Sequence, residues 1–229
     1  NGGMAKNVAD NVEALDMHIH TVTNKDSITK IRFVENRSSQ MVLRVDEHDH
    51  CERIDEFLLE GLVKNKFKKP PFGFDSRRED YYDAIIVSDY CKGFLEEEDI
   101  HHICKNNNNV FVDTKKKLGE WIKDVDYIKI NELEYKKNHE LLSDKGFEEK
   151  LIVTLGSKGC RYKDKVFNVE EVPVKDVSGA GDTFIAGLVR GYLDTSNIES
   201  AIEFAQKCTT HVVQKHGVAT VTLKEIQNG

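Results

Sequence analysis

From about residue 83 onward, short apolar runs alternate along the chain with segments whose apolar residues recur at helical spacing. Alternation of this kind is typical of successive βαβ units around a parallel sheet. Four runs are rich in β-branched residues and end in, or are followed by, polar or glycine residues: 84–88, 110–113, 127–130 and 151–155. They predict buried strands, with helices expected over 96–105, 132–142, 184–192 and 198–212. The sequence therefore predicts an α/β fold with ligands at the carboxyl ends of parallel strands.

Residues 28–46 lie outside this series of strands and helices. Apolar residues alternate with polar ones on either side of a polar stretch: Ile31 and Phe33 before it, and Met41, Leu43 and Val45 after it. This alternation predicts two half-exposed strands. We expect a β lid or dimer clasp over 28–46, with an ordinary edge hairpin as the alternative, and a main α/β domain over 1–27 and 47–229. A second alternating stretch, 160–172, predicts another hairpin.

Composition and charge restrict the partners of this chain. Lys and Arg total 33 against 40 Asp and Glu, so the formal net charge is -7 and no global positive field attracts nucleic acid or an anionic membrane. The five cysteines form no CxxC pair, and their odd number argues against a disulfide framework. No apolar run approaches the roughly 20 residues of a membrane span, and the first residues lack a signal-peptide core. We expect a cytoplasmic protein that binds neither nucleic acid nor membranes.

The strongest local signal is the segment 176–183, Asp-Val-Ser-Gly-Ala-Gly-Asp-Thr, which leads into an amphipathic stripe and predicts a helix N-terminus. Small residues at Gly179, Ala180 and Gly181 let a ligand approach the backbone, where free amides and the helix dipole form an anion site. Asp182 lies in the same turn, so its carboxylate can accept a proton from an attacking hydroxyl. Near a helix N-terminus this carboxylate should stay ionised. The alternative is an aspartate that only caps the helix.

These residues resemble the signature of the ribokinase-type (PfkB) carbohydrate kinases, a DxxGAGD turn that opens a helix, and residues 176–182 match it completely. Three further motifs of that family occur in order: GGxxxN at 2–7, NxxE at 131–134 and TxGxxG at 154–159. The resemblance implies a Rossmann-like, three-layer α/β/α ribokinase fold with a mostly parallel sheet and a small β lid. It also implies transfer of a phosphoryl group from ATP, with Mg²⁺, to a sugar hydroxyl.

The resemblance also assigns roles to single residues. Asp182 is the catalytic base, and the backbone of Gly179, Ala180 and Gly181 cradles the phosphoryl oxygens. The residues implied around the nucleotide and its metal are Asn131, Glu134 (to Mg²⁺ through water), Thr154, Gly156, Gly159, Lys215 and Gly217. The last two belong to the segment 215–218, which is expected to pass near the adenine. For the asparagine and the glutamate, the alternative is a helix cap and a surface carboxylate.

On the sugar side, the resemblance implies contacts with hydroxyls from Gly2, Gly3 and Asn7. The residues placed to hold a sugar that already carries a phosphate are Asp89, Lys92 and Lys115. Lysines at this position suit a phosphorylated substrate, because a plain hexose offers them no anion. The alternative is a pair of solvated lysines at strand ends.

Within the family, three segments resemble the kinases that phosphorylate D-glycero-D-manno-heptose 7-phosphate at C1. These segments are 88–95 (SDYxKGxL), 112–115 (a strand ending in DPK) and 212–221 (VVxKxGTATV). A heptose 7-phosphate kinase is therefore the preferred hypothesis, and a homodimer through the lid is implied by resemblance. The alternatives are another kinase of the family, such as a fructokinase, ribokinase or nucleoside kinase, and a degenerate nucleotide-binding scaffold.

The chain departs from the family pattern at its start. Such kinases open with a strand and an acidic residue that holds the sugar, whereas this sequence starts at the GG segment. The stretch between the first helix and residue 28 is also short. A natural deletion would remove strands and part of the sugar site. The other interpretation is that the sequence belongs to a longer chain.

Overall fold

The computed structural model describes residues 3–26, 28–34, 41–63, 82–142 and 146–228. Within these residues the main sheet has six strands in the order β3-β4-β5-β6-β7-β8. The strands are β3 (Ile85–Asp89), β4 (Val110–Thr114), β5 (Tyr127–Asn131), β6 (Leu151–Thr154), β7 (Cys160–Tyr162) and β8 (Lys165–Phe167). The first four pair in parallel, and β7 and β8 follow antiparallel. The predicted strands and their parallel arrangement are confirmed, although the second hairpin ends at Phe167, before residue 172.

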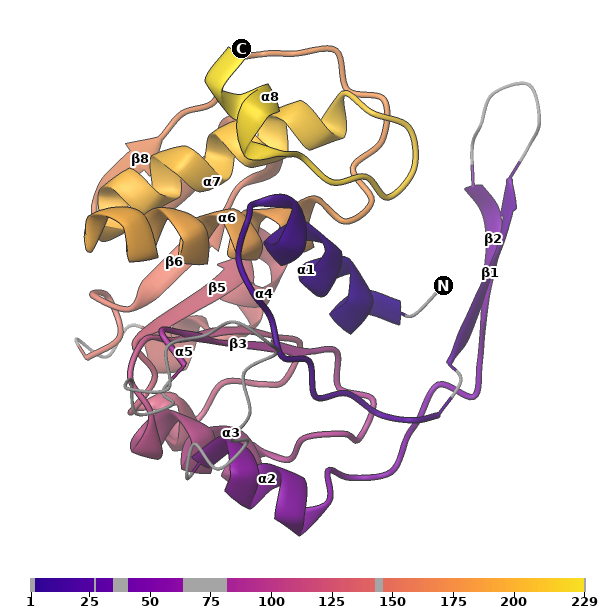
Figure 1. The fold of residues 1–229 in the computed structure, drawn as a ribbon, viewed down its shortest axis with the longest axis vertical. Helices are drawn as coiled ribbons and strands as arrows, with labels where there is room; N and C mark the ends of the chain where they lie inside the picture. The colour runs from indigo at the N-terminus through magenta and orange to yellow at the C-terminus, as the bar shows by residue number, and fades with distance from the viewer. Residues whose placement is uncertain (1–2, 27, 35–40, 64–81, 143–145, 229) are drawn as a thin grey trace.

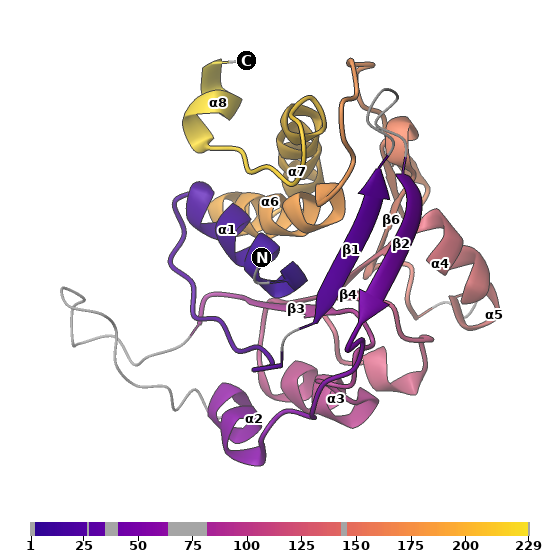
Figure 2. The same cartoon turned by 90° about the vertical axis from the view of Figure 1, so that its right-hand side faces the viewer.

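Helices cover both faces of this sheet, which gives three layers (Figures 1 and 2). One face carries α1 (Gly3–Ala14), α6 (Ala180–Thr195), α7 (Ile198–Val213) and α8 (Leu223–Asn228). The other carries α2 (Glu56–Val63), α3 (Glu97–Asn106) and the 3-10 turn η1 (Glu120–Ile122). A second 3-10 turn, η2 (Gly156–Lys158), follows β6. In the described part of the chain, no helix has the length and apolar character needed to cross a bilayer.

The predicted helix over 132–142 is wrong in one respect, because it is interrupted at Asn138. It forms two short helices, α4 (Glu132–Lys137) and α5 (His139–Leu142). The buried side chain of Asn138 donates from Nδ2 to the carbonyl of Glu134 at 2.8 Å and accepts from the amide of Leu118 at 2.9 Å. A side chain that bonds to nearby backbone in this way competes with the helix ladder. The interruption therefore anchors the segment that leads to η1.

The strands expected over 28–46 form a separate antiparallel ribbon of β1 (Thr29–Val34) and β2 (Met41–Glu47). Phe33 pairs with Leu43 and Ile31 pairs with Val45, so these apolar side chains share one face. Figure 1 shows the ribbon standing apart from the helices of the main body. Phe33 and Leu43 are accordingly about half exposed. Its role as a lid or clasp stays a prediction.

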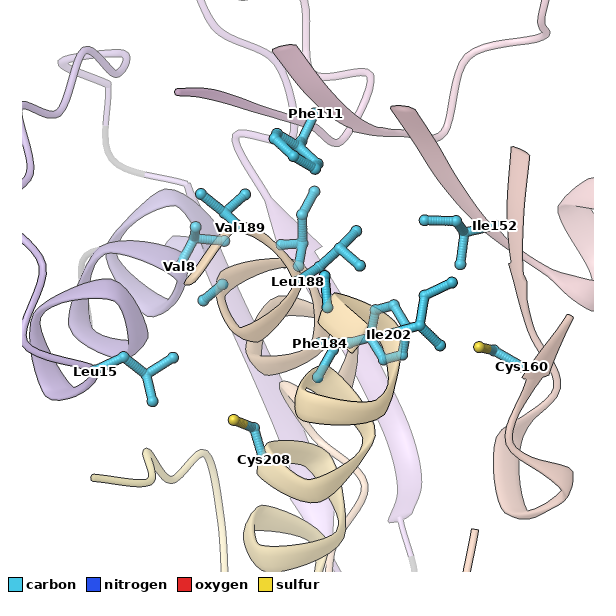
Figure 3. Packing of buried hydrophobic residues seen from close by; sticks show 14 of the residues in the cluster. Val8, Leu15, Phe111, Ile152, Cys160, Phe184, Leu188, Val189, Ile202 and Cys208 are labelled. Atoms are coloured by element: carbon cyan, nitrogen blue, oxygen red, sulfur yellow. The ribbon is translucent and has the colours of Figure 1, made fainter. Parts of the chain in front are cut away.

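Helices α6 and α7 approach closely because small residues line their contact. A Cβ on Gly191 would lie 2.8 Å from Cα of Ala201, and one on Gly187 would lie 3.0 Å from Cα of Ala205. Around this contact, Phe184, Leu188 and Ile202 join the sheet residues Phe111 and Ile152 in one apolar cluster (Figure 3). The close contact fixes the axis of α6, and therefore the place where its first turn meets the sheet.

Replacing Gly191 by leucine should force the two helices apart. Overpacking of this kind lowers the free energy of unfolding by about 1–3 kcal/mol. Urea unfolding followed by circular dichroism measures this loss. The matched control is Glu203→Leu on the exposed face of α7, which should change stability by less than about 0.5 kcal/mol. Equal losses in both variants would contradict this account of the helix contact.

Candidate active site

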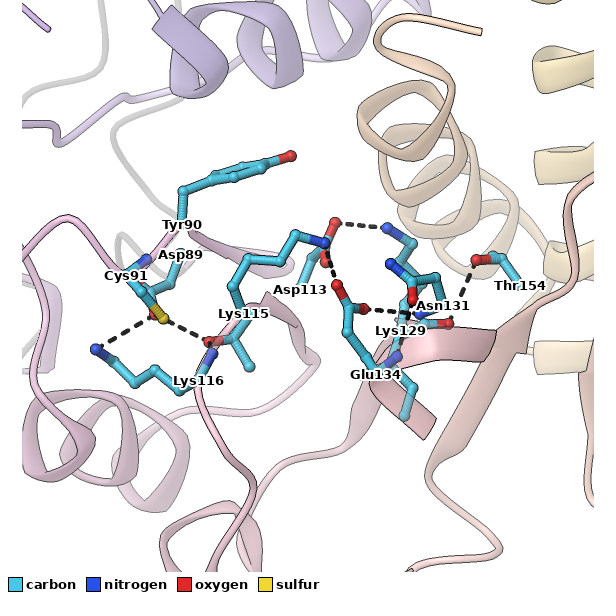
Figure 4. Close-up of polar contacts among 12 residues, drawn as sticks. Asp89, Tyr90, Cys91, Asp113, Lys115, Lys116, Lys129, Asn131, Glu134 and Thr154 are labelled. Carbon is cyan, nitrogen blue, oxygen red and sulfur yellow. Dashed lines mark hydrogen bonds and ion pairs between the residues drawn. The ribbon is translucent and has the colours of Figure 1, made fainter. Parts of the chain in front are cut away.

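A cleft of about 590 Å³ opens where the carboxyl ends of the parallel strands meet the first turn of α6. This is the position at which open α/β sheets bind their ligands. Polar side chains from several elements line it: Tyr90, Lys115, Lys129, Asn131, Thr154 and Asp182. Figure 4 shows how most of these side chains converge from the strand ends.

The first turn of α6 presents its backbone to this cleft. Gly179 caps the helix with a φ of 81°, a left-handed conformation that favours glycine. Among the described residues, hydrogen bonds use the amides of Ala180, Asp182 and Thr183, which leaves those of Gly179 and Gly181 for a ligand. The predicted anion site at a helix N-terminus therefore has the geometry that an anion requires.

The aspartate that opens this turn fixes its shape. Asp176 accepts from the amide of Ser178 at 2.8 Å through Oδ1 and from the amide of Gly217 at 3.1 Å through Oδ2. These backbone bonds to the ionised form hold the pKa of Asp176 below its usual value. Gly217 has a φ of 70°, and Lys215 binds the carbonyl of Thr220 and Oε1 of Glu225. The loop that was expected near the adenine is thus joined to the anion turn.

Asp182 is only 1% exposed, yet its side chain borders the cleft. Its Oδ2 accepts from Nδ2 of Asn7, and its Oδ1 accepts from the hydroxyl of Tyr90 at 2.8 Å. Burial raises the pKa of Asp182, and the hydrogen bonds from Asn7 and Tyr90 oppose this rise. The net shift is upward, so burial outweighs these two donors and is the physical reason that the carboxylate becomes a better proton acceptor.

A second layer of hydrogen bonds joins α1 to α6. The hydroxyl of Thr183 donates to Oδ1 of Asn11 at 2.9 Å, and Nδ2 of Asn11 donates to the carbonyl of Asn7 at 2.8 Å. Asn11 and Thr183 are both fully buried. The asparagine expected to contact sugar therefore sits on a helix that is locked to the turn. Gly3 begins the same helix, while Gly2 lies outside the described residues.

Asn131 and Glu134 form a reciprocal cap at the start of α4. Oδ1 of Asn131 accepts from the amide of Glu134 at 2.9 Å, and Oε2 of Glu134 accepts from the amide of Asn131 at 2.8 Å. The helix cap of the alternative is therefore confirmed, whereas Glu134 is not a surface carboxylate, because its side chain is only 13% exposed. The other carboxylate oxygen of Glu134 forms an ion pair with Lys115, a residue of the cleft wall (Figure 4). A role toward a metal stays a prediction.

The three residues expected after β6 have different surroundings. Thr154 and Gly156 line the cleft, and the hydroxyl of Thr154 donates to the carbonyl of Ile130 at 3.3 Å. Gly159 has a φ of 86°, and a Cβ there would lie 1.9 Å from the carbonyl oxygen of Phe167. The structure thus places Gly159 against the β8 backbone, outside the cleft lining.

Asp89 and Lys92 also lie outside the residues that line the cleft. Asp89 accepts from the amide of Cys91 at 3.1 Å and from the hydroxyl of Thr114 at 2.9 Å. Lys92 forms an ion pair with Asp49. Of the three residues expected at a sugar phosphate, Lys115 is the one that borders the cleft.

Three residues of the site were not assigned from the sequence: Tyr90, Asp113 and Lys129. Tyr90 directly follows the end of β3, and Asp113 is the residue before the last in β4. Such strand-end positions are a signal for both. Lys129 lies inside an otherwise apolar strand, where a charged residue is itself unusual.

The family described as pfkB family carbohydrate kinase matches residues 77–225 of this chain. A curated relative, the bifunctional protein HldE of a Nitratiruptor species, is 31% identical over 222 residues. The match covers 89% of this chain and 45% of that protein. The chain thus spans about half the length of the curated relatives that it matches.

Solved structures share the fold at low sequence identity. Phosphofructokinase-2 from Escherichia coli, in complex with potassium, has a TM-score of 0.68 at 14% identity and is matched over 97% of this chain and 84% of that chain. Ribokinase from Arabidopsis thaliana, complexed with ribose and ATP, has a TM-score of 0.62 at 17% identity, over 93% of this chain and 72% of that chain. These likenesses confirm the predicted ribokinase-type fold.

Replacing Tyr90 by phenylalanine should raise the pKa of Asp182 further. The phenol hydroxyl donates to the ionised carboxylate and so favours it, and its loss leaves the effect of burial less opposed. The measurement is a pH titration of the Asp182 carboxyl carbon by NMR. The control is Tyr135→Phe, because the ring of Tyr135 stacks on Arg161. This variant should leave the pKa of Asp182 unchanged. An unchanged or lowered pKa in Tyr90→Phe would contradict the role given to this hydrogen bond.

Proposed function

This chain belongs to the pfkB family of carbohydrate kinases, and we propose that it transfers the γ-phosphoryl group of ATP to a hydroxyl of a sugar phosphate. One observation carries the proposal. A buried carboxylate with a raised pKa and two open backbone amides lie in the same helix turn at the mouth of the sheet. Phosphoryl transfer needs both a proton acceptor and a site for developing negative charge.

The proposed reaction uses Asp182 as the base. The attacking sugar hydroxyl gives its proton to the carboxylate as its oxygen bonds to the γ-phosphorus, and the bond from that phosphorus to the bridging oxygen of ADP breaks. Asn7 and Tyr90 hold the two carboxylate oxygens in place through their hydrogen bonds. The amides of Gly179 and Gly181 face the oxygens of the transferring group. Most of the catalysis then comes from positioning and charge stabilisation.

The remainder of the cleft suits a nucleotide. Leu133 and Val177 line it and are largely exposed, so they offer apolar surface to the flat face of a base. We assign the base and sugar of ATP to this wall, with Thr154 and Gly156 beside it. The residues expected near the adenine, Lys215 and Gly217, follow in the loop that Asp176 joins to the turn.

The donor set fits Mg²⁺ held mainly by the nucleotide phosphates. This ion keeps several waters and takes few protein ligands, often through a second-shell carboxylate. Glu134 would hold one of these waters, because its carboxylate is paired with Lys115, which lines the cleft. When bound, the ion would neutralise charge on the phosphates. Asn131 orients Glu134 through their shared cap.

For the acceptor, we propose heptose 7-phosphate, which would yield heptose 1,7-bisphosphate. The support is the resemblance of segments 88–95, 112–115 and 212–221 to that group of kinases, together with the similarity to proteins named HldE. Gly2, Gly3 and Asn7 would contact hydroxyls, and Asp89, Lys92 and Lys115 would serve the substrate phosphate. The ribbon 28–46 would act as a lid, with its exposed apolar face as a clasp between two copies.

Two alternative functions would give different substrate preferences and activities. Another kinase of the family, acting on fructose, ribose or a nucleoside, would prefer one of those acceptors over the heptose phosphate. A degenerate scaffold would bind ATP without phosphorylating any sugar. The intact turn and cap at residues 176–182 and 131–134 favour an enzyme over a scaffold.

Asp182→Asn should lower kcat by roughly 10²–10⁴-fold, the usual contribution of a general base. The assay compares heptose 7-phosphate with ribose, fructose and adenosine, and calorimetry checks that ATP still binds. Asp194→Asn, on the exposed end of the same helix, is the matched control and should keep wild-type turnover. If neither wild type nor variant phosphorylates any sugar while ATP binds, the scaffold function prevails.

Lys115→Met should raise the KM for heptose 7-phosphate by about tenfold, because one charge-assisted hydrogen bond contributes about 1.5–3 kcal/mol. Lys92→Met should change this KM less, since Lys92 is paired with Asp49 outside the cleft lining. Steady-state kinetics with each substrate varied in turn shows whether Lys115 acts on the sugar phosphate or on ATP. A rise confined to the KM for ATP would assign Lys115 to the nucleotide instead.

A further inference from the structure

A charged residue lies in the middle of the buried sheet. Lys129 is the third residue of β5, and it faces Asp113 of β4 across the parallel ladder. Its Nζ lies 2.6 Å from Oδ2 of Asp113, and the two side chains are only 6% and 2% exposed (Figure 4). Burial of two charges is costly unless their hydrogen bonds are complete.

This pair is incompletely satisfied within the described residues. An ammonium group carries three donors, and Asp113 Oδ2 is the acceptor that the structure provides for Lys129. The other oxygen of Asp113, Oδ1, is buried without a hydrogen-bond partner there. Apolar residues of similar volume usually replace a buried ion pair without loss of stability. Stability alone therefore does not explain the pair. The unused N–H donors of Lys129 indicate that the ammonium binds a ligand.

The geometry shows where that ligand lies. Lys129 lines the cleft, and a Cβ on Gly181 would lie 3.0 Å from the Lys129 Nζ. Glycine at this position keeps open the space between the amine and the turn. The amine, the free amide of Gly181 and the neighbouring carboxylate of Asp182 therefore border one volume, and Lys129 is close enough to Asp182 to oppose the rise in its pKa.

Lys115, the other cation of the cleft wall, is placed differently. Its ammonium forms an ion pair with Glu134 and lies 5.7 Å from the ring centre of Tyr90. Its charge is thus balanced by a carboxylate at the rim. Lys129 is instead paired with the more deeply buried Asp113, and its ammonium lies against Gly181 in the lining of the cleft.

We propose that Lys129 is a catalytic residue whose ammonium binds the oxygens of the transferring phosphoryl group, and that Asp113 is the positioning residue that holds this ammonium beside Gly181. The inference rests on the proposed function and adds a cation to the anion site. A compact ammonium suits this task because it presents a point charge to phosphate oxygens. Charge spreads over these oxygens during transfer, so the contact strengthens in the transition state.

The test compares wild type with Lys129→Met and with the double variant Asp113→Asn/Lys129→Met. The double variant is needed because the single change leaves Asp113 as an uncompensated buried charge, which can prevent folding. Lys136→Met on the exposed side of α4, where Lys136 pairs with Glu132, is the matched control. Calorimetry with Mg²⁺ measures the affinity for ADP and for the non-hydrolysable β,γ-imido analogue of ATP, and kinetics measures kcat.

The Lys129 variants should bind the triphosphate analogue about tenfold more weakly and bind ADP within about twofold of wild type. Their kcat should fall roughly 10²–10³-fold, as when one donor to the transition state is removed. The proposal is overturned if the folded double variant keeps wild-type kcat and affinity ratio, or if both nucleotides weaken equally. If wild type phosphorylates no sugar, the proposed function fails, and the ratio of the two affinities still decides whether Lys129 meets the γ-phosphoryl group.

Discussion

The hydrogen bonds between α1 and the first turn of α6 are the contact on which the site depends. The side chain of Asn7 donates a hydrogen bond to the carboxylate of Asp182. The side chain of Asn11 accepts one from the hydroxyl of Thr183, the next residue of the turn. Both bonds are buried or partly buried, where an unpaired polar group costs about 1–3 kcal/mol. The close packing of α6 on α7 fixes the helix axis, and α1 then fixes how the turn faces the strands. The open amides of the turn, the Asp182 carboxylate and Asn7 are positioned together by this arrangement.

The electrostatics of the cleft follow from which charges are buried and which are paired. Burial raises the pKa of Asp182, while the hydrogen bonds from Asn7 and Tyr90 oppose part of this rise and hold the carboxylate in a defined orientation. Glu134 is paired with Lys115 at the rim, and Asp113 is paired with Lys129 at the floor. An anionic ligand that enters this cleft meets cations already held by carboxylates. It therefore gains their attraction without ordering them first, which is the advantage of preorganisation.

Much of the fold could be predicted from the sequence because it rests on local patterns. The β-branched run at 127–130 and the turn at 176–182 each define an element with little reference to the rest of the chain. Lys129 could not be assigned in this way, because its role depends on the register that places it opposite Asp113. The role expected for Asp89 from its strand-end position stays a prediction, and its hydrogen bond to Thr114 depends on the pairing of β3 with β4. The break at Asn138 likewise depends on a distant partner, Leu118.

Asp176 contacts two parts of the proposed nucleotide site with one carboxylate. Its oxygens reach the amide of Ser178 in the anion turn and the amide of Gly217 in the loop assigned to the adenine. The span from the base end of the site to its phosphate end is thereby set within the protein itself. In the proposed site, the triphosphate of a nucleotide bound at the loop would extend to the turn, whereas a shorter phosphate chain would stop before it. Under the proposed function, the fixed spacing of these two amides would let the site distinguish a triphosphate from a diphosphate.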